Sequence, residues 1–213
     1  MVQIKICGVR DVDTAGFCVE QGVDFLGLVF YPPSRRYVDP ASARSIVRAF
    51  QGQIKFVGVF MDAPEEEVNR TAEEVGVDYI QLHGKESPAY CQRMRRPVIK
   101  AFGVGPTFSF RELEPYRQNV LYHLFDNPKW GSGCAFDWLR LKGSEGTKAA
   151  LTKPFFLAGG LNPENVREAI RETGPAGVDV SSGVETNGRK DLEKVRKFVN
   201  AVRYPLSVAQ YSL

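Results

Sequence analysis

The sequence of 213 residues is long enough to bury one full hydrophobic core, and α/β barrels reach this length without splitting into two domains. Its 28 basic against 25 acidic side chains leave a formal charge of +3, which excludes the strongly basic surface of a nucleic-acid-binding protein. The amino terminus has no signal-peptide pattern, and no apolar run reaches about 18 residues, so we expect a cytoplasmic protein without a membrane partner.

Short apolar runs that are typical of β-strands alternate along the chain with longer amphipathic stretches that are typical of α-helices. The predicted strands cover residues 2–7, 23–30, 54–60, 77–83, 97–102, 119–126, 154–158 and 177–181. The predicted helices cover residues 11–21, 40–50, 64–75, 86–95, 109–117, 136–142, 163–173 and 190–202. Because each of the eight strands is followed by a helix, this pattern predicts a parallel sheet.

Turn residues support these boundaries. The pairs Asp39-Pro40 and Asn162-Pro163 each place a capping side chain before a proline, which predicts that helices begin at residues 40 and 163. The tripeptide Gly-Val-Asp recurs at residues 22–24, 76–78 and 177–179, each time leading into a predicted strand. In the first two copies the glycine also fits the end of the preceding helix.

The recurrence of one βα unit favours a closed (β/α)8 barrel, the TIM barrel of the α/β class, over an open sheet. Since the composition shows no break or linker, we expect residues 1–213 to form a single domain. The pattern predicts no packing for the tail at residues 204–213. Active sites of such barrels lie at the C-terminal ends of the strands, so candidate residues are expected there.

Four widely spaced cysteines form no CxxC pair, and without a signal peptide we expect them to be reduced thiols; they are Cys7, Cys18, Cys91 and Cys134. The only two histidines are His83 and His123, and neither has other ligands at metal-binding spacing. We therefore expect no metal site.

Two of the predicted strands end in groups that can exchange protons. Strand alternation places Lys5 and Cys7 on one face, and the nearby ammonium favours a thiolate that would act as a base near neutral pH. Asp126, at the end of another strand, is the candidate acid. Simpler alternatives are a buried cysteine that only packs, and an aspartate that only begins the turn at Asn127-Pro128.

Other polar residues follow the predicted strands. His83 shares its inward parity with Gln81, which makes it a rival acid or base, although a histidine that only lines the wall is the simpler alternative. Arg35 and Arg36 follow the second strand. They could be solvated, or one of them could hold a carboxylate through two hydrogen bonds.

Glycines follow the last two predicted strands. Gly159-Gly160 and Ser182-Gly183 let backbone N–H groups approach an anion, and phosphate binds at these loops in many barrels. The alternative is that these glycines only make tight turns. Gly131-Ser132-Gly133-Cys134 lacks the third glycine of a dinucleotide fingerprint, so we expect it to be part of a flexible cover over the site.

Several short motifs run in order from residue 4 to about residue 200. They are Lys5-Ile6-Cys7-Gly8, Gly27-Leu28-Val29-Phe30, Ser34-Arg35-Arg36-Tyr37-Val38, Gln81-Leu82-His83-Gly84, Phe125-Asp126 with Gly131-Ser132-Gly133, Phe136-Asp137-Trp138, the stretch 157–166 and the stretch 178–185. As a set they resemble the phosphoribosylanthranilate isomerase family of the tryptophan pathway. The resemblance covers nearly the whole chain.

This resemblance implies a (β/α)8 barrel that needs no cofactor and converts N-(5-phosphoribosyl)anthranilate to the corresponding 1-deoxyribulose phosphate by an Amadori rearrangement. It implies that Asp126 is the general acid that opens the sugar ring, and that Cys7 is the general base that removes a proton from the second sugar carbon. It also implies substrate-binding roles for Arg36, which would hold the anthranilate carboxylate, Asp179 and His83, and phosphate-binding roles for Gly159, Gly160, Ser182 and Gly183. The partner is then a small phosphosugar, and the protein is a monomer or a homodimer.

Three alternatives remain open. An indole-glycerol-phosphate synthase would be expected to carry a catalytic lysine and glutamate set. A histidine-pathway isomerase would use two aspartates, and position 7 is not one. A barrel that binds phosphosugars without catalysis would tolerate the loss of Cys7.

Overall fold

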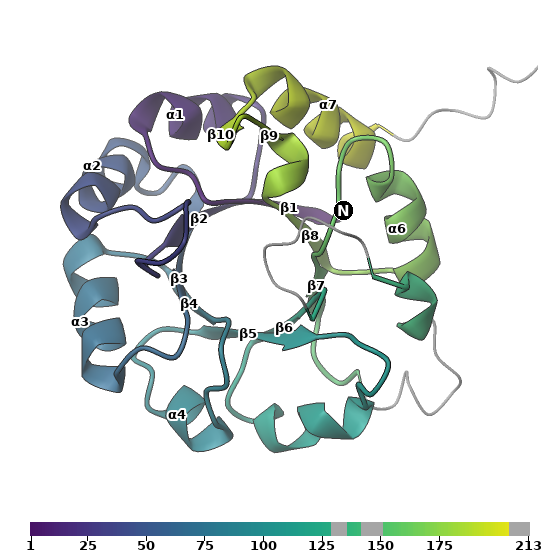
Figure 1. The fold of residues 1–213 in the computed structure, drawn as a ribbon. Coiled ribbons are helices and arrows are strands. Elements are labelled where there is room, and N and C mark those ends of the chain that lie inside the picture. The colour runs from purple at the N-terminus through teal and green to yellow at the C-terminus, as the bar shows by residue number, and fades with distance from the viewer. Residues whose placement is uncertain (129–135, 142–150, 205–213) are drawn as a thin grey trace, which may run out of the picture.

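The computed structural model describes residues 1–128, 136–141 and 151–204, so the tail beyond Tyr204 lies outside the described residues. Eight parallel strands close into a barrel ringed by helices (Figure 1). The strands are β1 (Gln3–Cys7), β2 (Phe25–Val29), β3 (Lys55–Phe60), β4 (Tyr79–Leu82), β5 (Val98–Gly103), β6 (Tyr122–Asp126), β7 (Phe155–Leu157) and β8 (Gly177–Val180). Since β1 pairs with both β2 and β8, the sheet is closed and the predicted (β/α)8 barrel is confirmed.

Helices surround the barrel in the order that the sequence predicts. The α-helices are α1 (Val12–Glu20), α2 (Pro40–Phe50), α3 (Glu65–Val75), α4 (Pro88–Gln92), α6 (Val166–Thr173) and α7 (Leu192–Arg203). After β8 come a short 3-10 helix, η3 (Ser182–Val184), and a hairpin of β9 (Glu185–Thr186) and β10 (Arg189–Lys190). No helix in the described ranges is both long enough and apolar enough to cross a membrane.

Two of the predicted α-helices are wrong in type, and a third is too long. The segment predicted at 109–117 is the 3-10 helix η1 (Phe110–Tyr116), which contains Pro115, a residue without the backbone N–H that an α-helix needs. Of the segment predicted at 136–142, the described residues contain only the short 3-10 helix η2 (Trp138–Arg140). The helix predicted at 86–95 shrinks to α4.

The two predicted proline caps differ in outcome. Asp39 caps α2, with proline at the first helical position, as predicted. The predicted helix start at residue 163 is wrong, because α6 begins three residues later. The Asn162 side chain instead accepts the backbone N–H groups of Glu164 and Asn165 at 2.9 and 3.0 Å. It therefore stabilises the turn before the helix.

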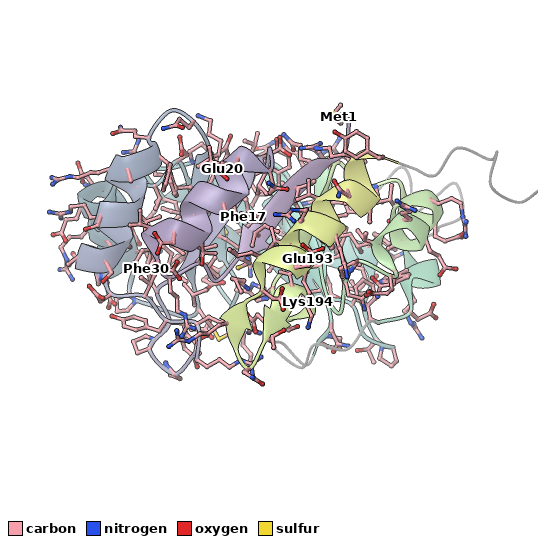
Figure 2. All side chains as sticks on the ribbon, turned by 90° about the horizontal axis from the view of Figure 1, so that it is seen from above. Met1, Phe17, Glu20, Phe30, Glu193 and Lys194 are labelled. Carbon is pink, nitrogen blue, oxygen red and sulfur yellow. The ribbon has the colours of Figure 1, made fainter. Side chains whose placement is uncertain are left out.

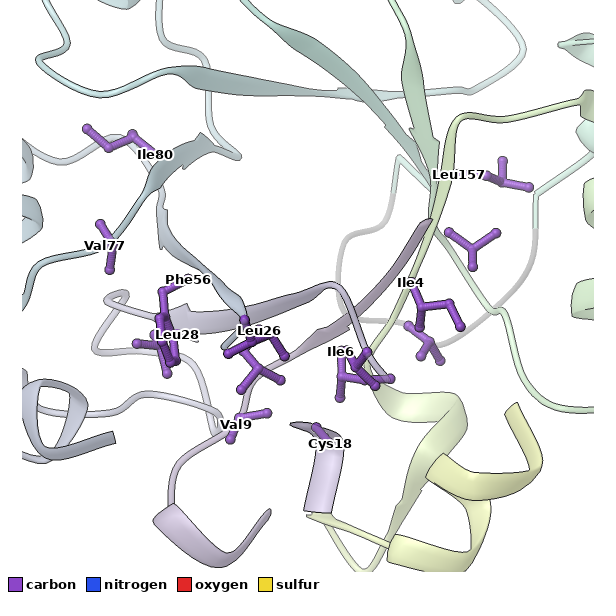
Figure 3. Packing of buried hydrophobic residues seen from close by; sticks show 14 of the residues in the cluster. Ile4, Ile6, Val9, Cys18, Leu26, Leu28, Phe56, Val77, Ile80 and Leu157 are labelled. Atoms are coloured by element: carbon purple, nitrogen blue, oxygen red, sulfur yellow. The ribbon is translucent and has the colours of Figure 1, made fainter. Parts of the chain in front are cut away.

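Alternation along the strands divides the core into an inner and an outer layer. The inner layer fills the barrel with Cys7, Phe25, Val29, Val57, Val59, Ile99, Ala101, Leu124, Phe156 and Ala158. The outer layer points toward the helices and includes Ile4, Ile6, Leu26, Leu28 and Leu157 (Figure 3). Each fully buried aliphatic side chain stabilises the fold by about 1.5–3 kcal/mol, so both layers are needed.

The first and last helices lie side by side where the barrel closes (Figure 2). The guanidinium of Arg196 on α7 lies over the ring of Phe17 on α1, 5.4 Å from its centroid. Arg203 at the end of α7 donates to the carbonyl oxygen of Val2 at 2.8 Å and to the carboxylate of Asp24 at 2.6 Å. These contacts tie the two ends of the described chain together at the N-terminal end of the barrel.

A histidine, His123, is buried in the outer layer of the core. His123 on β6 is 1% exposed, and its ring packs near those of Phe102 and Phe125. Within the described residues neither ring nitrogen has a hydrogen-bond partner. Burial, and to a lesser extent the charge of Lys153, lowers the pKa of His123 to about 4. The ring is therefore neutral in the folded protein at neutral pH.

We predict that His123 makes the fold sensitive to acid. The unfolded chain binds a proton at this histidine below about pH 6.5, while the folded protein binds it only near pH 4. The free energy of unfolding therefore decreases by about 3 kcal/mol as the pH is lowered from about 6.5 to about 4. His123→Phe removes this loss of stability, because phenylalanine has no group that can bind the proton. Urea unfolding of the wild type and the variant at pH 7 and pH 4.5 measures the loss in each protein. An equal fall in both proteins would show that His123 is not responsible.

Candidate active site

A cavity of about 530 Å³ opens at the C-terminal ends of the strands. Its size suits a small-molecule ligand. The predicted site residues that line it are Cys7, Arg36, His83, Asp126, Gly159, Gly160, Asp179 and Ser182. Gly183 is not among the lining residues. The predicted cover at residues 131–134 lies outside the described residues.

Cys7 lies beside a buried ion pair at the joint of β1 and β8. Parallel pairing sets Lys5 opposite Asp179, and the Lys5 Nζ lies 3.0 Å from the Asp179 Oδ1. Lys5, on the same strand face as Cys7, is fully buried. A Cβ at Gly27 would lie 2.8 Å from the Cys7 Sγ and 3.1 Å from the Lys5 Nζ, so only glycine leaves room for both groups.

The prediction that Lys5 makes Cys7 a thiolate near neutral pH is wrong for this structure. Burial is the largest effect and raises the pKa of the Cys7 thiol, whereas Lys5 and Lys190 only partly offset it. Asp179 raises the pKa of Cys7 further, because its negative charge opposes that of the thiolate. Burial also acts against a charged Lys5, but Asp179 and Cys7 outweigh it, and the pKa of Lys5 is raised.

Asp126 lies across the barrel from Cys7, at the end of β6. Its Oδ2 lies 3.3 Å from the Nε2 of His83, and its Oδ1 accepts the backbone N–H of Asn127 at 2.7 Å. The other ring nitrogen of His83, Nδ1, lies 2.8 Å from the Nε2 of Gln81. His83 therefore does more than line the wall, because it contacts the candidate acid directly.

The loop that carries His83 is held from behind by a buried ion pair. The Nζ of Lys100 on β5 lies 3.1 Å from the carboxylate of Glu86 and also donates to the carbonyl oxygens of Leu82 and Gly84 at 3.3 and 2.7 Å. Glu86 in turn accepts the backbone N–H of Gly84 at 3.0 Å. The backbone on both sides of His83 is thereby tied to β5.

Arg36 does hold a carboxylate through two hydrogen bonds, but the carboxylate belongs to the same chain. Its Nε and Nη2 donate to the two oxygens of Glu185 at 2.7 and 3.0 Å. Its neighbour Arg35, 61% exposed, lies 3.3 Å from the same carboxylate. A Cβ at Gly8, where φ is +81°, would lie 2.6 Å from the Arg36 Cδ, so glycine lets the arginine stem cross the end of β1.

The loops after β7 and β8 touch each other. Gly159 and Gly160 have φ values of +76° and +66°, a conformation that glycine adopts without strain. A Cβ at Gly183 would collide with the carbonyl group of Leu161, so a glycine there lets the two loops touch. The Oγ of Ser181, next to Ser182, donates to the carbonyl oxygen of Cys7 at 2.9 Å and links this region to β1.

Sequence reasoning missed Glu185, Lys190, Lys100 and Glu86. Lys100 could have been found, because a lysine inside an apolar strand needs a buried acidic partner. Glu185 and Lys190 lie in a polar stretch that reads as an ordinary surface loop, although both side chains are buried by about 95%. Their burial depends on how the hairpin folds back onto the barrel.

The fold and the site together define a (β/α)8-barrel enzyme in which the candidate acid and base line one small-ligand cavity. No cluster of three metal-binding side chains occurs in the described part of the chain. The family model for N-(5'-phosphoribosyl)anthranilate (PRA) isomerase matches residues 4–201. The chain belongs to this family, as the sequence motifs predict.

Individual relatives agree with this assignment. The chain is 43% identical to the N-(5'-phosphoribosyl)anthranilate isomerase of Desulforudis audaxviator, covering 97% of this chain and 100% of the relative, and 45% identical to that of Geobacter sp. strain M21, covering 93% and 97%. The phosphoribosylanthranilate isomerase of Thermus thermophilus has a TM-score of 0.86 at 35% identity, covering 94% of this chain and 98% of the other.

Two further solved structures bear on ligand and assembly, each covering 94% of this chain and 98% of the other at 37% identity. One, with a TM-score of 0.83, is an isomerase in complex with reduced 1-(o-carboxyphenylamino)-1-deoxyribulose 5-phosphate. The other, with a TM-score of 0.81, consists of monomers generated from the dimeric isomerase of Thermotoga maritima. This chain is accordingly an isomerase, which sets aside the synthase alternative.

We predict that Gly159→Ala lowers turnover by displacing the candidate acid. A Cβ there would lie 2.9 Å from the Asp126 Oδ1 and 2.8 Å from the backbone nitrogen of Asn127, so both must move. We expect at least about a tenfold loss of kcat, since small displacements of a proton donor are costly. Gly52→Ala is the matched control, because Gly52 has a similar φ of +80° with no atoms within 4 Å. Equal losses in both variants would contradict the steric explanation.

Proposed function

We propose that the chain converts N-(5'-phosphoribosyl)anthranilate to 1-(2-carboxyphenylamino)-1-deoxyribulose 5-phosphate, an Amadori rearrangement in tryptophan biosynthesis. The family match and the relative that binds a reduced form of this product support the substrate. The observation that carries the mechanism is that Cys7 and Asp126 face one cavity from opposite sides of the barrel. An acid and a base in different surroundings can keep different protonation states at one pH.

In the first step Asp126 gives its proton to the ring oxygen of the sugar. The bond between this oxygen and the first sugar carbon breaks, and the nitrogen lone pair forms the C=N bond of a protonated Schiff base. His83 and the backbone N–H of Asn127, both in contact with the Asp126 carboxyl, orient it toward the ring. A positioned acid of this kind accelerates a reaction by about 10²–10⁴.

In the second step Cys7, as the thiolate, removes the proton from the second sugar carbon. The electrons of that C–H bond form a C=C bond, and the C=N electrons return to nitrogen, which leaves an enolamine. Its enol O–H loses a proton, the first carbon gains one, and the ketone results. Because the pKa of Cys7 is raised, the thiolate that this step needs is the minor form of Cys7 at neutral pH, and Lys5 and Lys190, which lower that pKa against the effect of burial, are the groups that favour it.

The remaining site residues bind the ends of the substrate in this proposal. Arg36 holds the anthranilate carboxylate, and Asp179 contacts the sugar hydroxyl groups. The phosphate lies at the loops of Gly159-Gly160 and Ser182-Gly183, which meet at the same end of the barrel. The rearrangement moves protons within one molecule, so these residues are sufficient without a cofactor.

Three further points belong to the same proposal. The chain is one domain, because the helices α1 and α7 at its two ends pack against each other at the closure of one barrel. It acts in the cytoplasm, where reduced cysteines such as buried Cys18 and Cys91 are stable. It is a monomer or a homodimer, and the dimeric relative is the support for the second.

Removal of either proton-transfer group tests the mechanism. We expect Cys7→Ala and Asp126→Asn each to lower kcat by a factor of about 10²–10⁴. The decay of anthranilate fluorescence in freshly generated substrate measures kcat. Full activity in Cys7→Ala would move the base elsewhere, with His83 the next candidate. No turnover by the wild type would leave a barrel that binds phosphosugars without this reaction.

Inorganic phosphate tests the phosphate loops separately. We expect it to compete with the substrate, raising KM while leaving kcat unchanged, because it occupies only the phosphate end of the cavity. Sodium chloride at the same ionic strength is the control, since it screens charges equally without fitting the loops. The same KM in phosphate and in chloride would contradict the proposal that the loops after β7 and β8 bind the substrate phosphate.

A further inference from the structure

Glu185 has a buried carboxylate that pairs with Arg36, a residue that lines the cavity, and none of the proposed chemical steps uses it. It begins the β9–β10 hairpin, and its side chain is 5% exposed. It accepts two hydrogen bonds from Arg36 and lies 2.8 Å from the Nζ of Lys190, whose side chain is 4% exposed. We call these three residues, Arg36, Glu185 and Lys190, the arginine cluster.

The way Glu185 binds Arg36 determines which edge of the guanidinium remains for a ligand. A guanidinium has two edges that can each hold a carboxylate through parallel hydrogen bonds. Glu185 takes the edge formed by Nε and Nη2. The end-on edge, with Nη1 and the second hydrogen of Nη2, is then the edge for another carboxylate. Because Arg36 lines the cavity, a substrate carboxylate can meet this edge there.

The charges in the arginine cluster leave it attractive to an anion. Burial alone would raise the pKa of Glu185, but hydrogen bonds and charges from Arg36 and Lys190 outweigh it and lower that pKa to about 2. Glu185 is therefore ionised at neutral pH. The Nζ of Lys190 has three acceptors, namely Glu185 and the Oγ and carbonyl oxygen of Ser181, which match the three hydrogens of an ammonium group. Burial lowers the pKa of Lys190, and its hydrogen bond to Glu185 and the charge of that carboxylate oppose this effect. With Lys190 charged, two cations against one anion give the cluster a net charge of +1.

Both the side chain and the backbone of Glu185 are anchored. Lys194 on α7 donates to its carbonyl oxygen at 2.9 Å. Lys190 connects its carboxylate to Ser181, whose Oγ donates to the carbonyl oxygen of Cys7. Glu185 thus holds Arg36 at a fixed place relative to the end of β1, where the candidate base lies.

We propose that Glu185 is a positioning residue that presents the end-on edge of Arg36 to the anthranilate carboxylate, with Lys190 as the buried cation that keeps the cluster positive. This inference rests on the proposed function, in which Arg36 binds that carboxylate. A simpler role would be structural, with the ion pair only closing the hairpin onto the barrel. The two roles differ in whether the effect of Glu185 on substrate binding passes through Arg36.

The first experiment is a double-mutant cycle between Glu185→Gln and Arg36→Met, with KM and kcat measured by the decay of anthranilate fluorescence. We expect Glu185→Gln to raise KM by roughly 3–10-fold, the usual cost of ordering one long side chain, and to change kcat by less than about twofold. In the Arg36→Met background the same substitution should change KM no further. Additive effects on KM, or a KM that falls in Glu185→Gln, would overturn the inference.

The cycle also separates failure of this inference from failure of the proposed function. A KM unchanged in Arg36→Met would show that Arg36 does not bind the carboxylate, which overturns the proposed substrate contact and the inference with it. A raised KM in Arg36→Met together with additive effects of Glu185→Gln overturns the positioning role alone.

A second variant guards against loss of folding, because Glu185→Gln leaves Lys190 buried without its partner. The double variant Glu185→Gln/Lys190→Met removes both buried charges, and we expect the same raised KM from it. A return of KM to the wild-type value would mean that Glu185→Gln acts through the unpaired charge of Lys190 and not through the position of Arg36, which overturns the inference. Asp24→Asn is the matched control, since this carboxylate also pairs with an arginine, Arg203, but at the opposite end of the barrel. We expect no change of KM there.

Discussion

The buried ion pair between Lys5 and Asp179 lies at the joint where the barrel closes, and the candidate base depends on it. A lysine that is fully buried must have a partner, because an unpaired charge in the interior costs several kcal/mol. The in-register pairing of β1 with β8 supplies that partner. The same pairing fixes Cys7 at the rim, two residues beyond Lys5. The pairing of β1 with β8 thus both closes the sheet and places the candidate base.

Buried pairs of lysine and carboxylate recur behind each functional part of the cavity. Lys5–Asp179 lies beneath the base, Lys100–Glu86 holds the loop of His83 next to the candidate acid, and Lys190–Glu185 holds Arg36. Buried ion pairs add little net stability, because desolvation offsets most of the attraction. What these pairs do is restrict geometry, since each lysine also donates to backbone carbonyls or neighbours a site residue. The cavity is therefore shaped in part by three buried lysines that do not themselves line it.

Much of the fold and part of the site follow from local patterns. Strand alternation alone places Lys5 and Cys7 on one face of the strand and Ile4 and Ile6 on the other, because a strand has a period of two whatever surrounds it. The order of strands and helices predicts the parallel barrel for a similar reason. Helix type is less predictable, as η1 shows, since a proline such as Pro115 changes the hydrogen bonding without changing the amphipathic pattern.

Patterns within the sequence were enough to predict the barrel, the strand ends that carry Cys7 and Asp126, and the family to which the chain belongs. The raised pKa of Cys7 depends on the folded barrel, because burial and Asp179 act across strands and outweigh the lysine that is near in sequence. Only the tertiary structure paired Arg36 with Glu185, which lies 149 residues away along the chain. Local periodicity sets which way a side chain points, whereas the charge that it meets depends on distant segments brought together by the closure of the barrel.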